Sequence, residues 1–93
     1  MSYPREIYIP VPGTQYHLEV DKSKWDCNRE RAHCHVYNSK GARLAQVWLS
    51  SCTFKELPSD ISNRDQSRIL DKVSDYRWEI EDAYNYNRKF GAG

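Results

Sequence analysis

The sequence of 93 residues lacks a long apolar run, an excess of either charge and a secretion signal. No stretch of about 18 apolar residues occurs, so we expect no transmembrane helix, and no signal-peptide pattern opens the chain. With 14 basic and 13 acidic residues the net charge is +1, which argues against an acidic nucleic-acid mimic and against a generally basic nucleic-acid coat. We therefore expect a cytoplasmic protein that does not bind membranes.

The sequence also lacks a disulfide framework and any standard metal or nucleotide motif. Its three cysteines, Cys27, Cys34 and Cys52, are odd in number, which favours a reducing compartment and free thiols. Zinc sites usually use paired Cys-x2-Cys or His-x3-His elements, and neither occurs. No Gly-rich phosphate loop and no Ser or Cys nucleophile motif is found. We expect no cofactor and no bound metal.

What the sequence does contain is aromatic side chains and one well-marked hairpin. The 3 Trp, 7 Tyr and 2 Phe residues can close the core of one small domain spanning residues 1–93. Residues 33–38 and 43–50 have strand propensity and flank the turn cluster Asn-Ser-Lys-Gly at 38–41. Period-two alternation places Cys34 and Val36 on one face, and His33, His35 and Tyr37 on the other.

The remaining chain predicts two more strands and one long helix. Residues 6–11 indicate an edge strand between prolines, and residues 15–21 alternate as a half-buried strand. Residues 22–32 show no clear period and predict an ordered loop. Residues 62–89 predict a single helix that begins with the capping pair Ser62 and Asp65. The expected fold is α+β: an antiparallel sheet of about four strands, made of two hairpins, with one long C-terminal helix packed on one face.

Apolar residues of these elements form the predicted core. They are Tyr16, Leu18, Val20, Cys34, Val36, Val47, Leu49, Ile69, Val73, Tyr76 and Ile80. Trp78 lies nine residues from Ile69, about 180° from the apolar stripe of the helix, where it either faces solvent or is covered by the loop around Trp25.

The polar face of the hairpin is the first candidate site. An open sheet face with aromatic side chains and nearby cations suits stacked bases and phosphates of RNA, and residues 22–43 carry a local charge of +4. The candidate nucleic-acid-binding residues are His35, Tyr37, Gln46, Trp48, Arg29, Arg31, Lys40 and Arg43. An aromatic pair across a hairpin also stabilises a sheet with no ligand present.

The histidines admit three interpretations. His33 and His35 are candidate acid and base for a ribonuclease-type reaction, in which the RNA 2′-OH supplies the nucleophile. Together with His17 they could instead form a three-histidine metal site, with Cys34 excluded because it points to the opposite face. Otherwise they are exposed strand residues without a function.

The C-terminal end of the predicted helix is the second candidate site. Its aromatic, amide and cationic side chains are typical of protein contacts, and an overhanging helix could form a homodimer. The candidate partner-binding residues are Trp78, Tyr84, Tyr86, Arg88 and Phe90.

Residues 33–78 resemble a known family. His33-Cys34-His35-Val36, a Gly-containing turn, the strand at 45–49, Leu57-Pro58 and a helix with Trp78 are similar to a small bacterial domain of unknown function that is often encoded in toxin-antitoxin cassettes. The layout also resembles small ribonuclease toxins with a double-stranded-RNA-binding type of fold. The chain departs from the family at Ala32, where a proline is usual, in its longer helix and in its first 30 residues. The resemblance implies a hairpin-plus-helix fold and a functional role for His33 or His35.

From these features the sequence predicts an RNA-directed or partner-directed module of the toxin-antitoxin kind. The alternative is a protein-interaction module, or a phage-encoded inhibitor of a bacterial defence system, that acts through the long helix. Whether the protein is an enzyme stays open.

Overall fold

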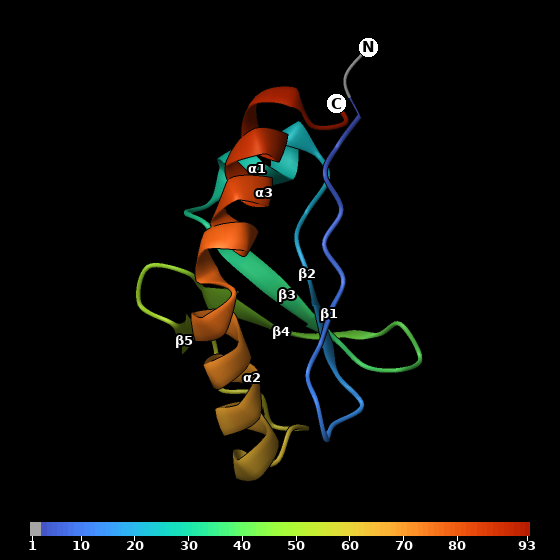
Figure 1. Cartoon of the computed structure of the whole chain (residues 1–93), viewed down its shortest axis with the longest axis vertical. Coiled ribbons are helices and arrows are strands. Elements are labelled where there is room, and N and C mark those ends of the chain that lie inside the picture. Colours follow the sequence, from blue (N-terminus) through green and yellow to red (C-terminus); the bar gives the residue numbers. More distant parts are fainter. Residues whose placement is uncertain (1–2) are drawn as a thin grey trace.

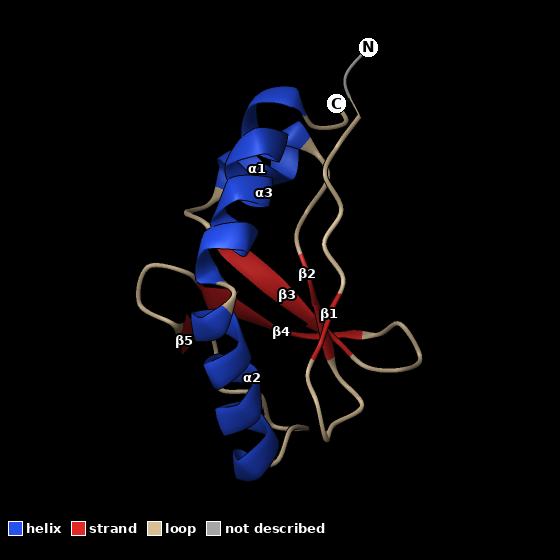
Figure 2. Cartoon of the chain, in the orientation of Figure 1, coloured by secondary structure: helices blue, strands red, loops and turns tan. Residues whose placement is uncertain are grey.

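The computed structural model describes residues 3–93 as an open antiparallel sheet with two helices across one face (Figures 1 and 2). The strands neighbour one another in chain order from β1 to β5. They are β1 (Ile9–Pro10), β2 (His17–Glu19), β3 (His33–Tyr37), β4 (Arg43–Trp48) and β5 (Thr53–Phe54), and the helices are α1 (Lys24–Arg29), α2 (Asn63–Asp75) and α3 (Arg77–Phe90). The α+β class and the antiparallel sheet are confirmed.

The central hairpin of β3 and β4 is the longest pairing in the sheet. Cys34 pairs with Val47 and His35 with Gln46, and a register shift lies between Val36 and Tyr37. In the turn, the Asn38 side chain accepts hydrogen bonds from two backbone amides, and Gly41 has φ 82°. A positive φ favours glycine, as the turn prediction required.

The outer strands differ from the prediction in number and extent. The expected strands 6–11 and 15–21 are reduced to two and three residues, because Pro10 and Pro12 lack the amide hydrogen that a longer ladder needs. The fifth strand, β5, was not predicted. It has only two residues and pairs through Val47–Phe54 and Trp48–Thr53, too short for a period to be visible.

The single helix predicted at 62–89 is wrong, because the chain forms two helices that follow one another along the molecule (Figure 1). Tyr76 leaves the helical region, with φ −110° and ψ 18°, although its amide still bonds to the Lys72 carbonyl. Its half-buried ring packs against the core. The apolar stripe continues in register across this break, so the sequence period gave no sign of it.

The core lies between the sheet and the helices α2 and α3. Leu18, Val36 and Val47 of the sheet are completely buried, as are Ile69 and Ile80 of the helices. Every predicted core residue is buried except Tyr76, which is half-buried. Alternation in the strands and the helical period therefore identified the inner face correctly.

Residues 22–32, predicted as a loop, contain the short helix α1. Ser23 caps it by accepting a hydrogen bond from the Asp26 amide at 3.4 Å. One and a half turns are too short to produce a helical period. Beside α1, the backbone of Ala92 bonds to Lys22 and Lys24, which ties the C-terminal end to this segment.

Helix α3 also makes a polar contact that holds the two ends of the chain together. The buried Asn87 side chain accepts from the Arg5 amide at 2.7 Å and donates to the carbonyls of Arg5 and Asp21, both at 2.9 Å. One amide group thus satisfies three backbone groups.

None of the helices in residues 3–93 combines the length and apolar character that crossing a membrane requires.

We expect Asn87→Ala to lower the free energy of unfolding by about 1 to 3 kcal/mol, because it leaves partly buried backbone groups without partners. Urea denaturation followed by circular dichroism measures the change. Asn85→Ala, an exposed position two residues earlier on α3, is the control and should change the free energy by less than about 0.5 kcal/mol. Equal effects of both substitutions would contradict this role of Asn87.

Candidate functional site

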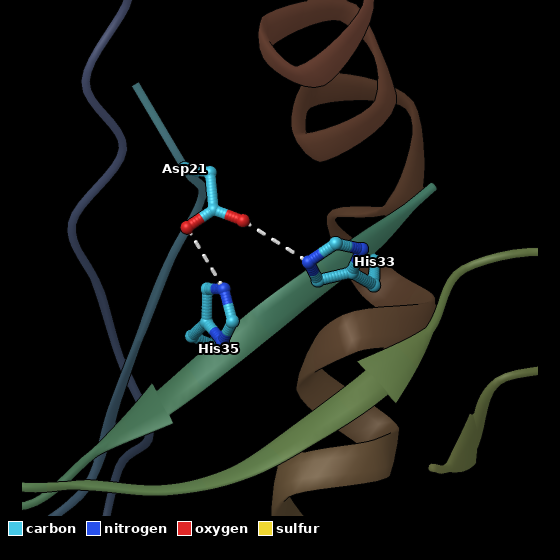
Figure 3. Close-up of side chains that lie close together, drawn as sticks. All are labelled: Asp21, His33 and His35. Carbon is cyan, nitrogen blue, oxygen red and sulfur yellow. Dashed lines mark hydrogen bonds and ion pairs between the residues drawn. The ribbon is translucent and has the colours of Figure 1, made fainter. Parts of the chain in front are cut away.

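The fold brings one carboxylate between the two histidines of β3. Glu19 of β2 pairs with His35, so Asp21, two residues further along and on the same face, arrives beside His33. The Asp21 Oδ2 atom lies 3.1 Å from His33 Nε2, and Oδ1 lies 2.9 Å from His35 Nε2 (Figure 3). No sequence motif pointed to Asp21. Pairing the predicted strands 15–21 and 33–38 in antiparallel register could have found it.

The Asp21 backbone is held in place by side chains of two helices. Its carbonyl accepts hydrogen bonds from Asn87 of α3 at 2.9 Å and from the Cys27 thiol of α1 at 3.3 Å. Since these contacts fix the main chain, they limit how far the carboxylate can move from the histidines.

The hydrogen bond that His33 makes to the backbone shows which of its ring nitrogens carries a hydrogen. Its Nδ1 lies 2.9 Å from the Arg31 carbonyl oxygen, which can only accept, so Nδ1 carries a hydrogen. The ring also packs edge-on against Trp48 and Tyr84, with centroids 5.9 and 5.5 Å away. Nε2 is therefore the nitrogen that faces Asp21.

His35 is 2% exposed and is not satisfied by hydrogen bonds. Its Nε2 lies 2.9 Å from Asp21 Oδ1, the distance of an ion pair, but neither ring nitrogen makes a hydrogen bond in residues 3–93. The His33 and His35 rings meet edge to face with centroids 5.0 Å apart. Two imidazoles and one carboxylate thus share a small volume.

The charges of this group shift its acid–base behaviour. Burial acts to raise the pKa of Asp21, but the adjacent His33 and His35 outweigh it and hold that pKa well below 3.8. Burial disfavours the His33 imidazolium, yet the Asp21 carboxylate, the Arg31 carbonyl and Glu30 together raise the pKa of His33 above 6.5. The charged Asp21–His33 pair therefore persists to a higher pH than an isolated histidine would allow.

A polar hollow of about 280 Å³, here called the histidine pocket, opens over these residues. It is lined by Asp21, Asp26, Arg29, Glu30, His33, His35, Arg43, Gln46 and Lys55. Lys55 and Glu30 form an ion pair of 2.6 Å, and the Gln46 side-chain oxygen is buried with no hydrogen-bond partner among residues 3–93. A second hollow of about 360 Å³, beside β4 and residues 55–59, shares Arg43, Gln46 and Lys55 with the pocket.

The predicted nucleic-acid residues divide into three groups. Arg29, Arg43, Gln46 and His35 line the histidine pocket. Trp48 is half-buried, with the Arg31 guanidinium 4.3 Å from its ring centre. Tyr37 stacks on His17, with ring centroids 5.6 Å apart, and Lys40 lies in the exposed hairpin turn.

Two expectations about the histidines are wrong. His33, His35 and His17 are buried rather than exposed, because neighbouring side chains on the same sheet face close over them. His17 does not complete a three-histidine group, since its Nε2 contacts Glu19 at 2.6 Å and the clustered ligand atoms in residues 3–93 belong to Asp21, His33 and His35.

The predicted partner-binding residues on α3 differ in how far they are exposed to solvent. Trp78 is 77% exposed, as its position opposite the apolar stripe predicts, and the alternative that the Trp25 segment covers it is wrong. Tyr84 is completely buried, and its hydroxyl donates to the carbonyls of Cys27 and Glu30 at 2.6 and 2.9 Å. The prediction that Tyr84 meets a partner is therefore wrong. Of the others, Tyr86 stacks under Arg5, Arg88 lies over Tyr84, and Phe90 is half-exposed.

The thiols show no sign of reactivity. Cys27, Cys34 and Cys52 are free, and Cys34 faces the core, as alternation predicted. Burial raises the pKa of Cys27 to about 11 and that of Cys34 to about 12. Both are therefore protonated at neutral pH and poor nucleophiles.

Comparisons with protein-family models, with curated proteins and with solved structures find no match for this chain. The toxin-antitoxin resemblance of residues 33–78 accordingly stays a prediction. Chemically, the histidine pocket offers an imidazole whose pKa a carboxylate raises, and a second imidazole whose Nε2 lies 2.9 Å from the same carboxylate.

We expect Asp21→Asn to lower the His33 pKa relative to wild type in EDTA-containing buffer, because burial remains while the carboxylate charge is lost. Nuclear magnetic resonance of the histidine ring nitrogens measures it. Glu19→Gln, which removes the carboxylate next to His17, is the control and should leave the His33 pKa unchanged. An unaltered His33 pKa in Asp21→Asn would refute the pairing.

The Asp21–His33 pair also makes the free energy of unfolding depend on pH. A raised histidine pKa stabilises the fold below the unfolded value of 6.5, and the benefit is lost as pH rises through the folded value. A lowered aspartate pKa stabilises above 3.8, and the benefit is lost as pH falls through the folded value. The contribution of the pair is therefore complete between pH 3.8 and 6.5, which denaturation of wild type and Asp21→Asn across pH can check.

Proposed function

We propose that the protein is an RNA-directed module that binds single-stranded RNA on the sheet face opposite α2 and α3. The observation that carries the proposal is an aromatic row across this face. Tyr8 stacks on His17 with centroids 4.1 Å apart, and His17 stacks on Tyr37 at 5.6 Å. Further along, Trp48 lies under Arg31. Tyr8 is 69% exposed, so its free side can stack a base.

Cations lie between the two ends of this row. Arg29, Arg43 and Lys55 line the histidine pocket, and Arg31 and Lys55 approach the Trp48 ring from 4.3 and 5.7 Å. Cations that follow the phosphates while bases stack on aromatic rings are the usual means of binding single strands. The pocket also holds Asp21, Asp26 and Glu30, so we expect moderate affinity that depends strongly on salt.

A cleavage step would use the histidines beneath this surface. His33, whose pKa the Asp21 carboxylate raises, would act as the acid and His35 as the base toward a 2′-OH. Both rings are 2% exposed, so an RNA segment must displace pocket side chains to reach them. We therefore propose RNA binding as the function, and cleavage of the bound RNA can be followed in the same samples.

We expect fluorescence anisotropy with a labelled 12-nucleotide RNA at low salt to show binding that Tyr8→Leu weakens about 5- to 100-fold, the cost of one lost stacking contact. Arg43→Gln should reduce the slope of log affinity against log salt by about 0.7. Trp78→Leu removes an equally exposed aromatic ring from α3 and is the control, which should bind like wild type. Absence of binding by wild type at low salt would refute the proposal.

The second candidate is protein contact through α3, favoured by the exposure of Trp78. We expect it to appear as a homodimer in sedimentation experiments that Trp78→Ala shifts toward monomer, because large exposed aromatic rings commonly carry contact energy. Tyr8→Leu is the control and should leave the association unchanged. A monomeric wild-type protein at all concentrations would exclude this homodimer.

A further inference from the structure

We propose that Asp21, His33 and His35 hold one divalent transition-metal ion, with Zn²⁺ preferred. The three ligand atoms, two imidazole nitrogens and one carboxylate oxygen, lie within 4.8 Å of one another at the floor of the histidine pocket (Figure 3). The inference goes beyond RNA binding and does not depend on it, because the stacking surface at Tyr8 and Trp48 needs no metal.

The orientation of His33 is that of a metal ligand. Its Nδ1 hydrogen donates to the Arg31 carbonyl at 2.9 Å, so in the neutral ring the lone pair of Nε2 faces the Asp21 carboxylate at 3.1 Å. Histidines that bind metals usually donate the other ring hydrogen to a backbone carbonyl or a carboxylate in this way. In the imidazolium a proton on Nε2 joins the ring to the carboxylate, and a metal ion that binds between the two atoms takes the place of that proton.

His35 supplies an independent argument. It is buried at 2% exposure and neither of its ring nitrogens has a hydrogen-bond partner in the described chain, although Nε2 lies 2.9 Å from an Asp21 oxygen. Buried polar atoms are almost always paired, and an exception calls for a reason. A metal ion shared with Asp21 and His33 satisfies Nε2 without requiring a hydrogen directed at the carboxylate.

The separations suit a metal ion. Zinc binds histidine nitrogen and carboxylate oxygen at about 2.0 to 2.2 Å, so neighbouring ligand atoms around it are roughly 3 to 3.5 Å apart in tetrahedral or octahedral arrangements. The contacts of 3.1 and 2.9 Å join the two histidine nitrogens to different Asp21 oxygens, and the three ligand atoms lie within 4.8 Å of one another, so side-chain movements must bring them closer together around one ion. The Asn87 and Cys27 contacts to the Asp21 carbonyl keep its carboxylate nearby.

The donor set selects the kind of metal. Two imidazoles and one carboxylate suit Zn²⁺ and its first-row neighbours, whereas Ca²⁺ and Mg²⁺ prefer sites built of oxygen ligands. Three protein ligands leave a position for water, which distinguishes such a site from a closed structural one. That position would face the pocket.

Wild-type protein gives the first test. Protein stripped with EDTA and dialysed is titrated with Co²⁺, and we expect visible d–d absorption that saturates at one equivalent and disappears when Zn²⁺ is added. Isothermal titration with Zn²⁺ should give the same stoichiometry. A thiolate-to-cobalt band in the near ultraviolet would place the metal on a cysteine and overturn the proposal, as would the absence of absorption at several equivalents.

Variants give the second test. Asp21→Asn and His35→Gln should each weaken Zn²⁺ binding more than about 100-fold, beyond the 10- to 100-fold that loss of an outer hydrogen-bond partner costs. His17→Gln, which alters the remaining histidine on the same sheet face, is the matched control and should bind Zn²⁺ like wild type. Loss of binding in His17→Gln, or its retention in a folded Asp21→Asn, would refute the assignment. If a variant fails to fold, the cobalt titration of wild type still decides.

Discussion

The contact on which most of this structure depends is that between α3 and the backbone around Asp21. Asn87 bonds to the carbonyl of Asp21 and to both backbone groups of Arg5, and Tyr84 donates to the carbonyls that end α1. Buried polar groups need such partners, because each one left unpaired costs about 1 to 3 kcal/mol. These two side chains therefore fix how the segment from Arg5 to Glu30 lies against α3. They also fix where the Asp21 carboxylate meets the histidines.

The parts of the fold that sequence could predict are those set by local periodicity. Alternation in residues 33–49 placed Cys34 in the core and the histidines on the opposite face, and the helical stripe placed Trp78 in solvent. The break at Tyr76, the short helix α1 and the two-residue strand β5 leave no period to detect. They are decided by tertiary packing and by hydrogen bonds between distant segments.

Only part of the candidate site could be predicted from the sequence, because the rest depends on contacts between distant segments. His33 and His35 are neighbours on one strand, so their common face follows from sequence, but Asp21 reaches them only through the pairing of β2 with β3. Their burial also depends on long-range contacts: residues from α1, β4 and the segment after β5 line the pocket over them. Tyr84 shows the same error as the histidines, exposure predicted where the side chain is buried. A composition typical of interfaces suggested exposure, whereas its ring fills the space between α3 and α1.

The polar cluster is difficult to explain as a stabilising feature. Removing charged and polar groups from water costs several kcal/mol per ion, and the Asp21–His33 attraction repays part of that cost. Within residues 3–93, the two ring nitrogens of His35 and the side-chain oxygen of Gln46 beside them make no hydrogen bond. Apolar side chains at these positions, where the sheet already excludes water, would often be as stable or more so. A buried polar cluster that apolar side chains could replace without loss of stability, placed in a pocket, favours a site kept for what it binds.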